Sequence, residues 1–231
     1  DQIREKIRTL SSAMKKSVAI LPSGNELRIS ISGGVAWYPA NGTDMDILKK
    51  YADFALYQVK RTNKGHLEEF SMEIYQQEAQ AAQLRRDFQQ LLTEERVYYV
   101  FQPIFSARTG KVMAYEALMR SDMEALRSPA TIMKLAREQG ALYEIERITF
   151  FHSSRSFLAL EESGRIPQER LLFVNSIASQ HLTDEEQQEY FRRFSHLLPH
   201  LVIEITEEEG LDLNALKAKR NIAGSAGAFA L

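Results

Sequence analysis

The sequence contains no cysteine, and this absence excludes several classes of site. Without thiols the chain forms no disulfide and no thiolate zinc or iron–sulfur centre, and it has no cysteine nucleophile. No apolar run approaches the ~18 residues that a membrane-spanning helix needs. The formal net charge is only −2, so the chain lacks the basic excess that marks a general nucleic-acid-binding protein.

The composition that remains is that of a soluble globular protein, because 44% of the 231 residues are apolar and 26% are charged. At ~150 residues per domain, this length corresponds to one or two domains. The chain begins at Asp1 inside a helical pattern and stops in an apolar run at 228–231. We therefore expect an internal piece of a longer protein, since natural termini are usually polar and solvated.

Residues 1–71 predict a small α/β piece. Apolar residues recur at helical spacing over 3–14, and alternation over 27–31 predicts a strand with one buried face. A second helix is expected to begin near Thr43 or Asp44, either of which could be its N-cap, and to end at Gly65. These elements offer only a small core, so we expect the piece to be incomplete by itself.

Residues 72–95 predict one long helix. The segment contains neither glycine nor proline, and its apolar residues keep helical spacing apart from an interruption in the second turn. We expect it to be a semi-rigid connector, with a domain boundary somewhere in 71–80.

The remainder, 96–231, predicts a mostly parallel α/β architecture. Two strands, Val97–Phe105 and 112–119, are expected to form a hairpin whose turn contains Gly110. Later helices are expected over 129–139, 141–161, from 184 onward and over 212–222, and later strands over 171–175, 201–206 and 227–231. Because helices and strands alternate, the strands after the hairpin should be parallel, in an open doubly wound sheet or part of a (β/α) barrel.

Three of these strands place an oxygen-bearing side chain among apolar neighbours: Glu116, Asn175 and Glu204. An ionised carboxylate in such a position is costly unless it is paired or bound to a metal. Two carboxylates and an amide oxygen suit Mg²⁺, Mn²⁺ or Ca²⁺ better than Zn²⁺. Spacing alone leaves the structural alternatives open, since each glutamate could be an edge residue or an ion-pair partner, and the asparagine could be a helix cap.

Four short motifs lie at residues 101–104, 115–120, 173–176 and 204–207. In this order they resemble motifs in the first half of the EAL domain, a family of bacterial cyclic di-GMP phosphodiesterases. Any one of them is weak, but four in the same order between residues 101 and 207 form a specific match. Residues 30–61 in addition resemble the last part of a GGDEF (diguanylate cyclase-type) domain, without that family's signature sequence.

The resemblance implies a definite organisation. Residues 1–71 would be the C-terminal part of a GGDEF-type α+β domain, 72–95 a connecting helix, and 96–231 the N-terminal part of an EAL-type modified (β/α) barrel with an antiparallel first strand. The family's Asp-Asp-Phe-Gly segment would follow the last residue. Because its aspartates complete the metal site, we expect residues 1–231 alone to be inactive.

The resemblance also implies chemistry for individual residues. Glu116, Asn175 and Glu204 would bind two Mg²⁺ or Mn²⁺ ions, with Glu116 also counted as catalytic. Arg120 would contact a substrate phosphate, for which a guanidinium is well suited, and Gln102 would lie near the ligand. The expected activity is metal-dependent hydrolysis of cyclic di-GMP to linear pGpG.

Further expectations follow from the same resemblance. The alternative function is a catalytically silent EAL module that acts as a cyclic di-GMP sensor or a protein-interaction domain. We expect a cytoplasmic location. The alternative that segments outside this chain anchor the parent protein to a membrane stays open. A homodimer through the helix over 72–95 also stays open, because its alanine and glutamine content favours such a pair only weakly.

Overall fold

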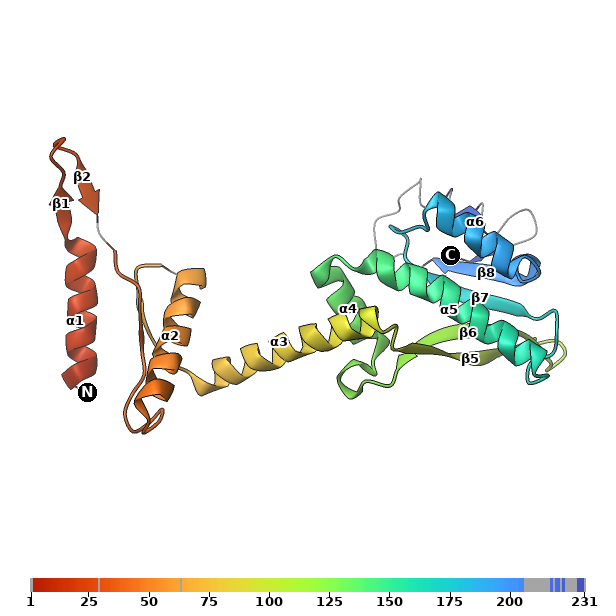
Figure 1. The fold of residues 1–231 in the computed structure, drawn as a ribbon, viewed down its shortest axis with the longest axis horizontal. Helices are drawn as coiled ribbons and strands as arrows, with labels where there is room; N and C mark the ends of the chain where they lie inside the picture. Colours follow the sequence, from red (N-terminus) through yellow and green to blue (C-terminus); the bar gives the residue numbers. More distant parts are fainter. Residues whose placement is uncertain are drawn as a thin grey trace. The chain divides into compact units, whose positions relative to one another are not determined.

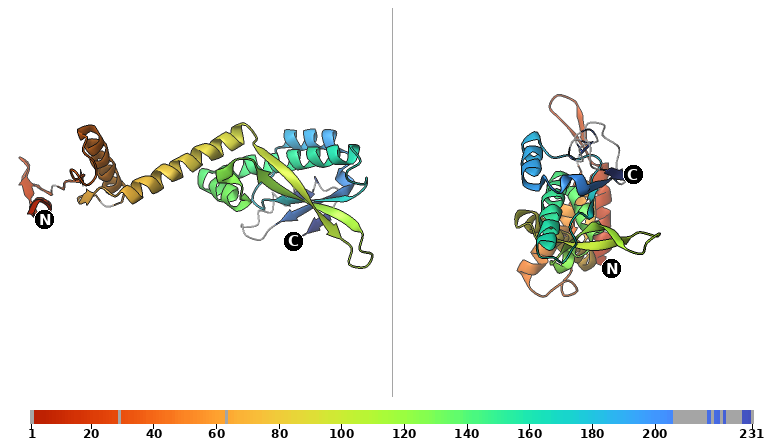
Figure 2. Two further views of the ribbon diagram at one scale, coloured as in Figure 1. Left: turned by 90° about the horizontal axis from the view of Figure 1, so that it is seen from below. Right: turned by 90° about the vertical axis from the view of Figure 1, so that its right-hand side faces the viewer.

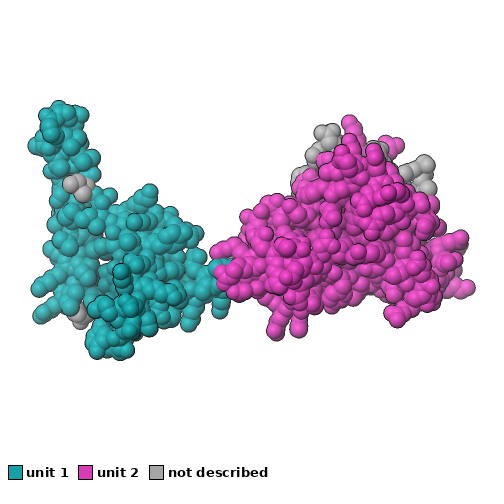
Figure 3. All heavy atoms as spheres, in the orientation of Figure 1, with its two compact units in different colours: residues 1–82 teal, residues 83–231 magenta. Residues whose placement is uncertain are grey.

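The computed structural model describes residues 2–28, 30–62 and 64–205, together with Lys217, Lys219, Arg220, Ile222 and the backbone of 228–230. The chain divides into two compact units, residues 1–82 (unit 1) and 83–231 (unit 2), shown in two colours in Figure 3. Among the described residues, no helix is both long enough and apolar enough to cross a bilayer.

The described residues of unit 1 form helices α1 and α2, the beginning of α3 (Met72–Thr93) and two separate pairs of short strands (Figure 1). The bounds are α1 Gln2–Lys16, β1 Val18–Ile20, β2 Glu26–Arg28, β3 Gly33–Val35, α2 Met45–Thr62 and β4 Leu67–Glu69. Strands β1 and β2 are antiparallel, whereas β3 and β4 are parallel.

Helix α2 starts directly after Asp44, one of the two predicted N-caps, and ends at Thr62, three residues before the predicted stop at Gly65. The carboxylate of Asp44 accepts hydrogen bonds from the backbone N–H groups of Asp46 and Ile47, at 2.9 and 3.0 Å, and Gly65 follows the helix with a φ of +85°. The helix packs closely on β3, because a Cβ at Gly34 would lie only 1.9 Å from the carbonyl oxygen of Ala52. Only glycine allows this close approach.

The predicted strand with a buried face over 27–31 is wrong. Strand β2 ends at Arg28, all three of its residues are exposed, and Leu27 keeps 48% of its surface in solvent. Its partner is β1, which the sequence analysis did not anticipate. The two strands form an isolated ribbon, so the alternation of apolar and polar residues has no packed layer to bury it. Ile29 lies outside the described residues.

Unit 2 is built on an open five-stranded sheet in the order β5-β6-β7-β8-β9. The strands are β5 Val97–Phe105, β6 Val112–Ser121, β7 Leu171–Ser176, β8 Leu201–Ile205 and β9 Ala228–Ala230. Strand β5 is antiparallel to β6, and the other neighbours are parallel. The hairpin and the parallel strands agree with the prediction, and no closed barrel is seen among the described residues.

The helices of unit 2 also follow the predicted alternation. They are α3 Met72–Thr93 (which begins in unit 1), the 3₁₀ helix η1 Glu124–Leu126, α4 Pro129–Gln139, α5 Leu142–Glu162, α6 Asp184–Phe194 and the 3₁₀ helix η2 Leu198–His200. Most of the predicted helix over 212–222 lies outside the described residues. The described residues of that stretch, Lys217, Lys219, Arg220 and Ile222, are all helical.

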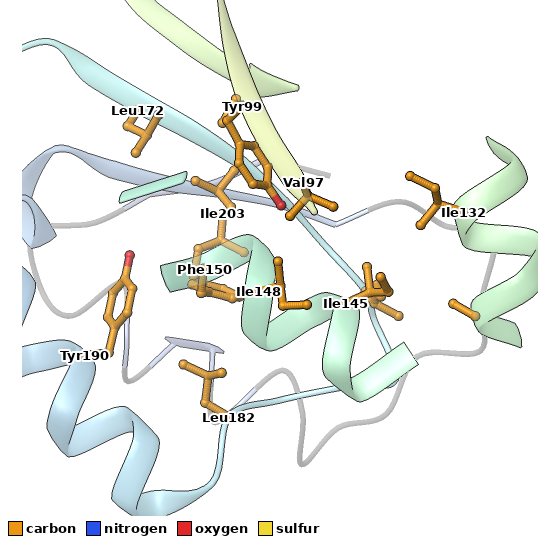
Figure 4. Packing of buried hydrophobic residues seen from close by; sticks show 14 of the residues in the cluster. Val97, Tyr99, Ile132, Ile145, Ile148, Phe150, Leu172, Leu182, Tyr190 and Ile203 are labelled. Carbon is orange, nitrogen blue, oxygen red and sulfur yellow. The ribbon is translucent and has the colours of Figure 1, made fainter. Parts of the chain in front are cut away.

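Helix α5 covers one face of the sheet and has α6 beside it (Figure 2). The core lies between these helices and the strands. Phe150 of α5 and Tyr190 of α6 pack edge to face with ring centroids 5.6 Å apart, and Tyr99 of β5 donates a 3.0 Å hydrogen bond from its hydroxyl to Thr149 (Figure 4). The buried tyrosines therefore keep their polar ends satisfied.

Burial along the strands shows which face of the sheet remains accessible. In β7, Leu172, Val174 and Ser176 are buried beneath the helices, whereas Leu171, Phe173 and Asn175 on the opposite face are only half-buried. We call this second surface the open face. It carries all of the predicted site residues.

Helix α6 offers a direct test of the local folding rules. Thr183 accepts a hydrogen bond from the backbone N–H of Glu186, and the carboxylate of Glu186 accepts one from the backbone N–H of Thr183. We expect Thr183→Ala to lower the free energy of unfolding by about 1 kcal/mol, because the backbone N–H of Glu186 loses its side-chain acceptor. Urea denaturation measures the loss. Equal stability of the variant would contradict a contribution from the cap.

Candidate active site on the open face

The strand pairing places the three predicted oxygen ligands on one face of the sheet. Asn175 on β7 and Glu204 on β8 are direct partners in the parallel register. Glu116 on β6 is paired with Phe173, two residues before Asn175 and therefore on the same face. The sequence could predict the strands, but only their register shows that these side chains share a face.

Glu116 and Asn175 are in direct contact. The amide Nδ2 of Asn175 donates a 3.0 Å hydrogen bond to Oε1 of Glu116. The amide nitrogen, not the oxygen, faces the carboxylate in this arrangement. Binding a cation between these two side chains requires the amide to turn over, so that its oxygen replaces its nitrogen.

Glu204 is electrostatically coupled to Glu116. Burial raises the pKa of Glu204, and the negative charge of Glu116 raises it further. Because the charge of Glu116 disfavours ionisation of Glu204, a divalent cation bound to these two half-buried carboxylates would be stabilising. Two carboxylates and an amide thus fit Mg²⁺ or Mn²⁺ in donor chemistry. Among the described residues, no group of three His, Cys, Asp or Glu side chains could hold a metal.

The two predicted substrate contacts also lie on the open face. Gln102 on β5 is the direct antiparallel partner of Glu116, and its side chain is exposed. Arg120 follows Glu116 by four residues on β6, and its Nη1 donates a 2.7 Å hydrogen bond to the carbonyl of Met119. The structure therefore brings Gln102 to the level of Glu116 and places Arg120 near the carboxyl end of the strand.

A cavity of about 340 Å³ lies at the carboxyl ends of β6 and β7. Arg120 and Asn175 contribute to its wall, and Met133 and Arg137 of α4 line it from the other side. This volume is within the range of ~300–1,000 Å³ typical of small-molecule sites. The carboxyl ends of parallel strands are also where open α/β sheets place their ligand sites.

A larger cavity, of about 580 Å³, lies in unit 1 and is lined in part by Arg4, Trp37 and Glu69. There Glu69 accepts hydrogen bonds from Arg4 at 2.9 Å and from the indole N–H of Trp37 at 2.8 Å. Two of the charged residues that line this cavity, Arg4 and Glu69, thus already form an ion pair with each other. It is larger than the cavity of unit 2, but it contains none of the predicted site residues.

The structure also contains a buried polar cluster that the sequence analysis missed. Glu146 of α5 and Lys219 are fully buried, and the Nζ of Lys219 lies 2.6 Å from Oε1 of Glu146. Burial raises the pKa of the Glu146 carboxyl, while the charge of Lys219 and hydrogen bonds from Ile177 and Ser176 act against that rise. In the sequence, the only sign of this cluster was Glu146 itself, a charged residue next to the apolar residues Ile145 and Ile148 of the predicted helix.

Comparison with known proteins decides the family. The family model described as the EAL domain matches residues 85–224. The chain belongs to the EAL domain family. Its EAL domain is homologous to those of cyclic di-GMP phosphodiesterases, among them NbdA of Pseudomonas aeruginosa, which is 28% identical over 173 residues. That match covers 74% of this chain and 22% of NbdA.

Other matches likewise cover most of this chain but only part of the related protein. The bifunctional diguanylate cyclase/cyclic di-GMP phosphodiesterase MucR of P. aeruginosa is 26% identical over 194 residues, covering 82% of this chain and 28% of MucR. The FimX EAL domain of Xanthomonas citri, solved in complex with c-diGMP, matches with 16% identity and a TM-score of 0.46, covering 64% of this chain and 56% of that one. The chain thus spans about a quarter of the length of these two curated relatives.

The tripeptide Glu-Ala-Leu occurs twice in the EAL domain, and the structure separates the two copies. The first, at 116–118, lies in β6 and directs Glu116 to Asn175. The second forms the 3₁₀ helix Glu124–Leu126, where Glu124 is exposed. Only the first copy lies in the candidate site. Glu124 is therefore a natural control position for experiments on Glu116.

Proposed function

We propose that the EAL domain in the complete protein hydrolyses cyclic di-GMP to linear pGpG with bound Mg²⁺ or Mn²⁺. The observation that carries the proposal is the juxtaposition of Glu116, Asn175 and Glu204 on the open face, with one direct contact and one shared register position. The relative NbdA, described as a cyclic di-GMP phosphodiesterase, supports the same reaction.

In this proposal Glu116, Asn175 and Glu204 hold the cations. Divalent ions of this kind lower the pKa of water and offset the charge that develops on phosphodiester oxygens. Divalent cations would be bound favourably between Glu116 and Glu204, because a cation relieves the repulsion by Glu116 that contributes to the raised pKa of Glu204.

Arg120 and Gln102 would orient the substrate. The guanidinium of Arg120 stays charged at any physiological pH and offers a planar pair of donors to a phosphate. Arg120 lines the 340 Å³ cavity together with Asn175, so a phosphate held there would lie next to one of the three proposed cation ligands. Gln102, directly across the hairpin from Glu116, can donate or accept a hydrogen bond at the other edge of the site.

We further propose that residues 1–71 are the C-terminal part of a GGDEF-type domain. The match to the bifunctional protein MucR extends over 194 residues, which is longer than the stretch from 85 to the last residue and so includes part of unit 1. The EAL model does not reach this region.

The proposal predicts metal-dependent turnover by the full-length protein. Incubation with cyclic di-GMP and Mg²⁺ or Mn²⁺ should give pGpG on anion-exchange chromatography. Excess EDTA should abolish the product, and added Mn²⁺ should restore it. Binding of cyclic di-GMP without product in the presence of both metals would instead support the silent sensor. Absence of both binding and product would contradict both functions.

A further inference from the structure

The buried cluster of Glu146, Ser176 and Lys219 lies directly behind the candidate site. Asn175 and Ser176 are neighbours at the end of β7, and strand geometry directs them to opposite faces of the sheet. Asn175 is on the open face with Glu116, whereas Ser176 is 3% exposed and faces α5. Contacts that fix the backbone of Ser176 therefore also fix the neighbouring Cα of Asn175, from which the Asn175 side chain extends.

Lys219 binds three groups at this point. Its Nζ donates hydrogen bonds of 2.6 Å each to Oε1 of Glu146, to the hydroxyl of Ser176 and to the carbonyl of Ile177. The hydroxyl of Ser176 donates in turn to Oε1 of Glu146, also at 2.6 Å. Ser176 thus uses both its donor and one of its acceptor positions inside the cluster.

Glu146 also binds the backbone at the end of β7. Its Oε2 accepts a 2.8 Å hydrogen bond from the N–H of Ile177, while the Nζ of Lys219 donates to the carbonyl oxygen of the same residue. The ladder between β7 and β8 ends at Ser176, so Ile177 has no strand partner in it. The ion pair therefore fixes both backbone groups of the first residue beyond the strand.

The same segment forms part of the cavity wall. Asn175, Ser176 and Ile177 line the 340 Å³ cavity, as does Arg120. A buried ion pair contributes little net stability compared with apolar side chains of the same volume, so stability alone gives little reason for its presence. Holding the groups that orient a ligand is a documented use of polar residues behind a metal site.

We propose that Glu146 and Lys219 are positioning residues, which hold the Ser176–Ile177 backbone so that the Asn175 amide is directed to Glu116 and to the cation site. The proposal rests on the proposed function insofar as Asn175 acts as a cation ligand. Its structural half, the orientation of Asn175, is independent of catalysis.

The test uses the full-length protein with Glu146→Gln and Lys219→Met combined. Removing both charges avoids leaving one of them buried without its partner, which is the strongly destabilising case. The matched control is Glu189→Gln with Arg193→Met, which removes an exposed ion pair of 2.9 Å from α6. Melting temperature, Mn²⁺ affinity by calorimetry and the side-chain amide NMR signal of Asn175 are measured for each protein.

We expect the cluster variant to melt within a few degrees of the control and to bind Mn²⁺ roughly 10- to 100-fold more weakly than the wild type. In the metal-free protein, the Asn175 amide signal should shift in the cluster variant and stay unchanged in the control. An unchanged Mn²⁺ affinity together with an unchanged Asn175 signal would overturn the proposal.

Two further outcomes separate this proposal from the proposed function. If the wild type binds no Mn²⁺ and has no turnover, the proposed function is wrong, and the Asn175 signal alone decides the positioning role. If the cluster variant does not fold, Ser176→Ala replaces it, since this change removes only one hydroxyl. It should shift the Asn175 signal and weaken Mn²⁺ binding by about 10-fold, the lower limit for such partners, and no effect on either would overturn the proposal.

Discussion

Replacing Glu116 with alanine should lower the turnover of cyclic di-GMP by at least ~100-fold while leaving the EAL domain folded. Even the partners of metal ligands change metal affinity or activity by about 10- to 100-fold, so loss of a ligand itself should cost more. Glu116 is half-buried, it accepts the hydrogen bond of Asn175, and its charge contributes to the raised pKa of Glu204. Turnover at saturating Mn²⁺ and substrate measures the effect.

The matched control is Glu124→Ala. It makes the same change in the same tripeptide, but at an exposed position of a 3₁₀ helix. Its turnover should stay within about twofold of the wild type, since surface substitutions away from special features have small effects. Equal losses in both variants would show that the tripeptide acts through the fold, and full activity of Glu116→Ala would remove Glu116 from the site.

The stability of Glu116→Ala separates loss of chemistry from loss of structure. The change removes one of two half-buried like charges, so the free energy of unfolding should be equal to or above that of the wild type. A marked drop in stability would mean that Glu116 supports the fold through Asn175, and the kinetic result would then need a second variant, Glu116→Gln.

The EAL domain could be predicted from sequence in its order of elements because each local signal agrees with the tertiary packing. Gly110 has the positive φ that the hairpin turn requires, and Thr183 with Glu186 forms the N-terminal cap of α6. Local signals failed in unit 1, where the alternation at Leu27 met no layer that could bury it. A strand pattern predicts a strand, but whether its apolar face is covered depends on what packs there.

The sequence likewise predicted one part of the candidate site, the residue types, but not the other, their arrangement in space. The types of residue at Glu116, Asn175 and Glu204 pointed to a hard cation, but their spatial relation depends on a parallel register that spacing cannot show. The pair formed by Glu146 and Lys219 is separated by 73 residues, and each position by itself reads as an ordinary charged residue of a helix. Only the packed structure brings them together.

The second large effect is expected from Lys219→Met alone. This variant leaves the carboxylate of Glu146 buried with no cation, and breaking a buried pair in this way costs about 3–5 kcal/mol. Chemical denaturation should show that loss against the wild type. Arg193→Met, which breaks the exposed pair with Glu189 and removes the guanidinium from the ring of Phe151, should cost far less, about 1 kcal/mol.

The pH dependence of this loss identifies its cause. Burial already raises the pKa of Glu146 above its ordinary value of 4.5, and removal of the Lys219 charge raises it further. A carboxyl whose folded-state pKa lies above its unfolded-state value costs nothing while it is protonated in both states, and destabilises increasingly as the pH rises. The variant should therefore be closest to the wild type near pH 4.5 and furthest from it at pH 8. A loss of stability that is equal at both pH values would show that missing packing of the lysine side chain, and not an unpaired charge, is responsible.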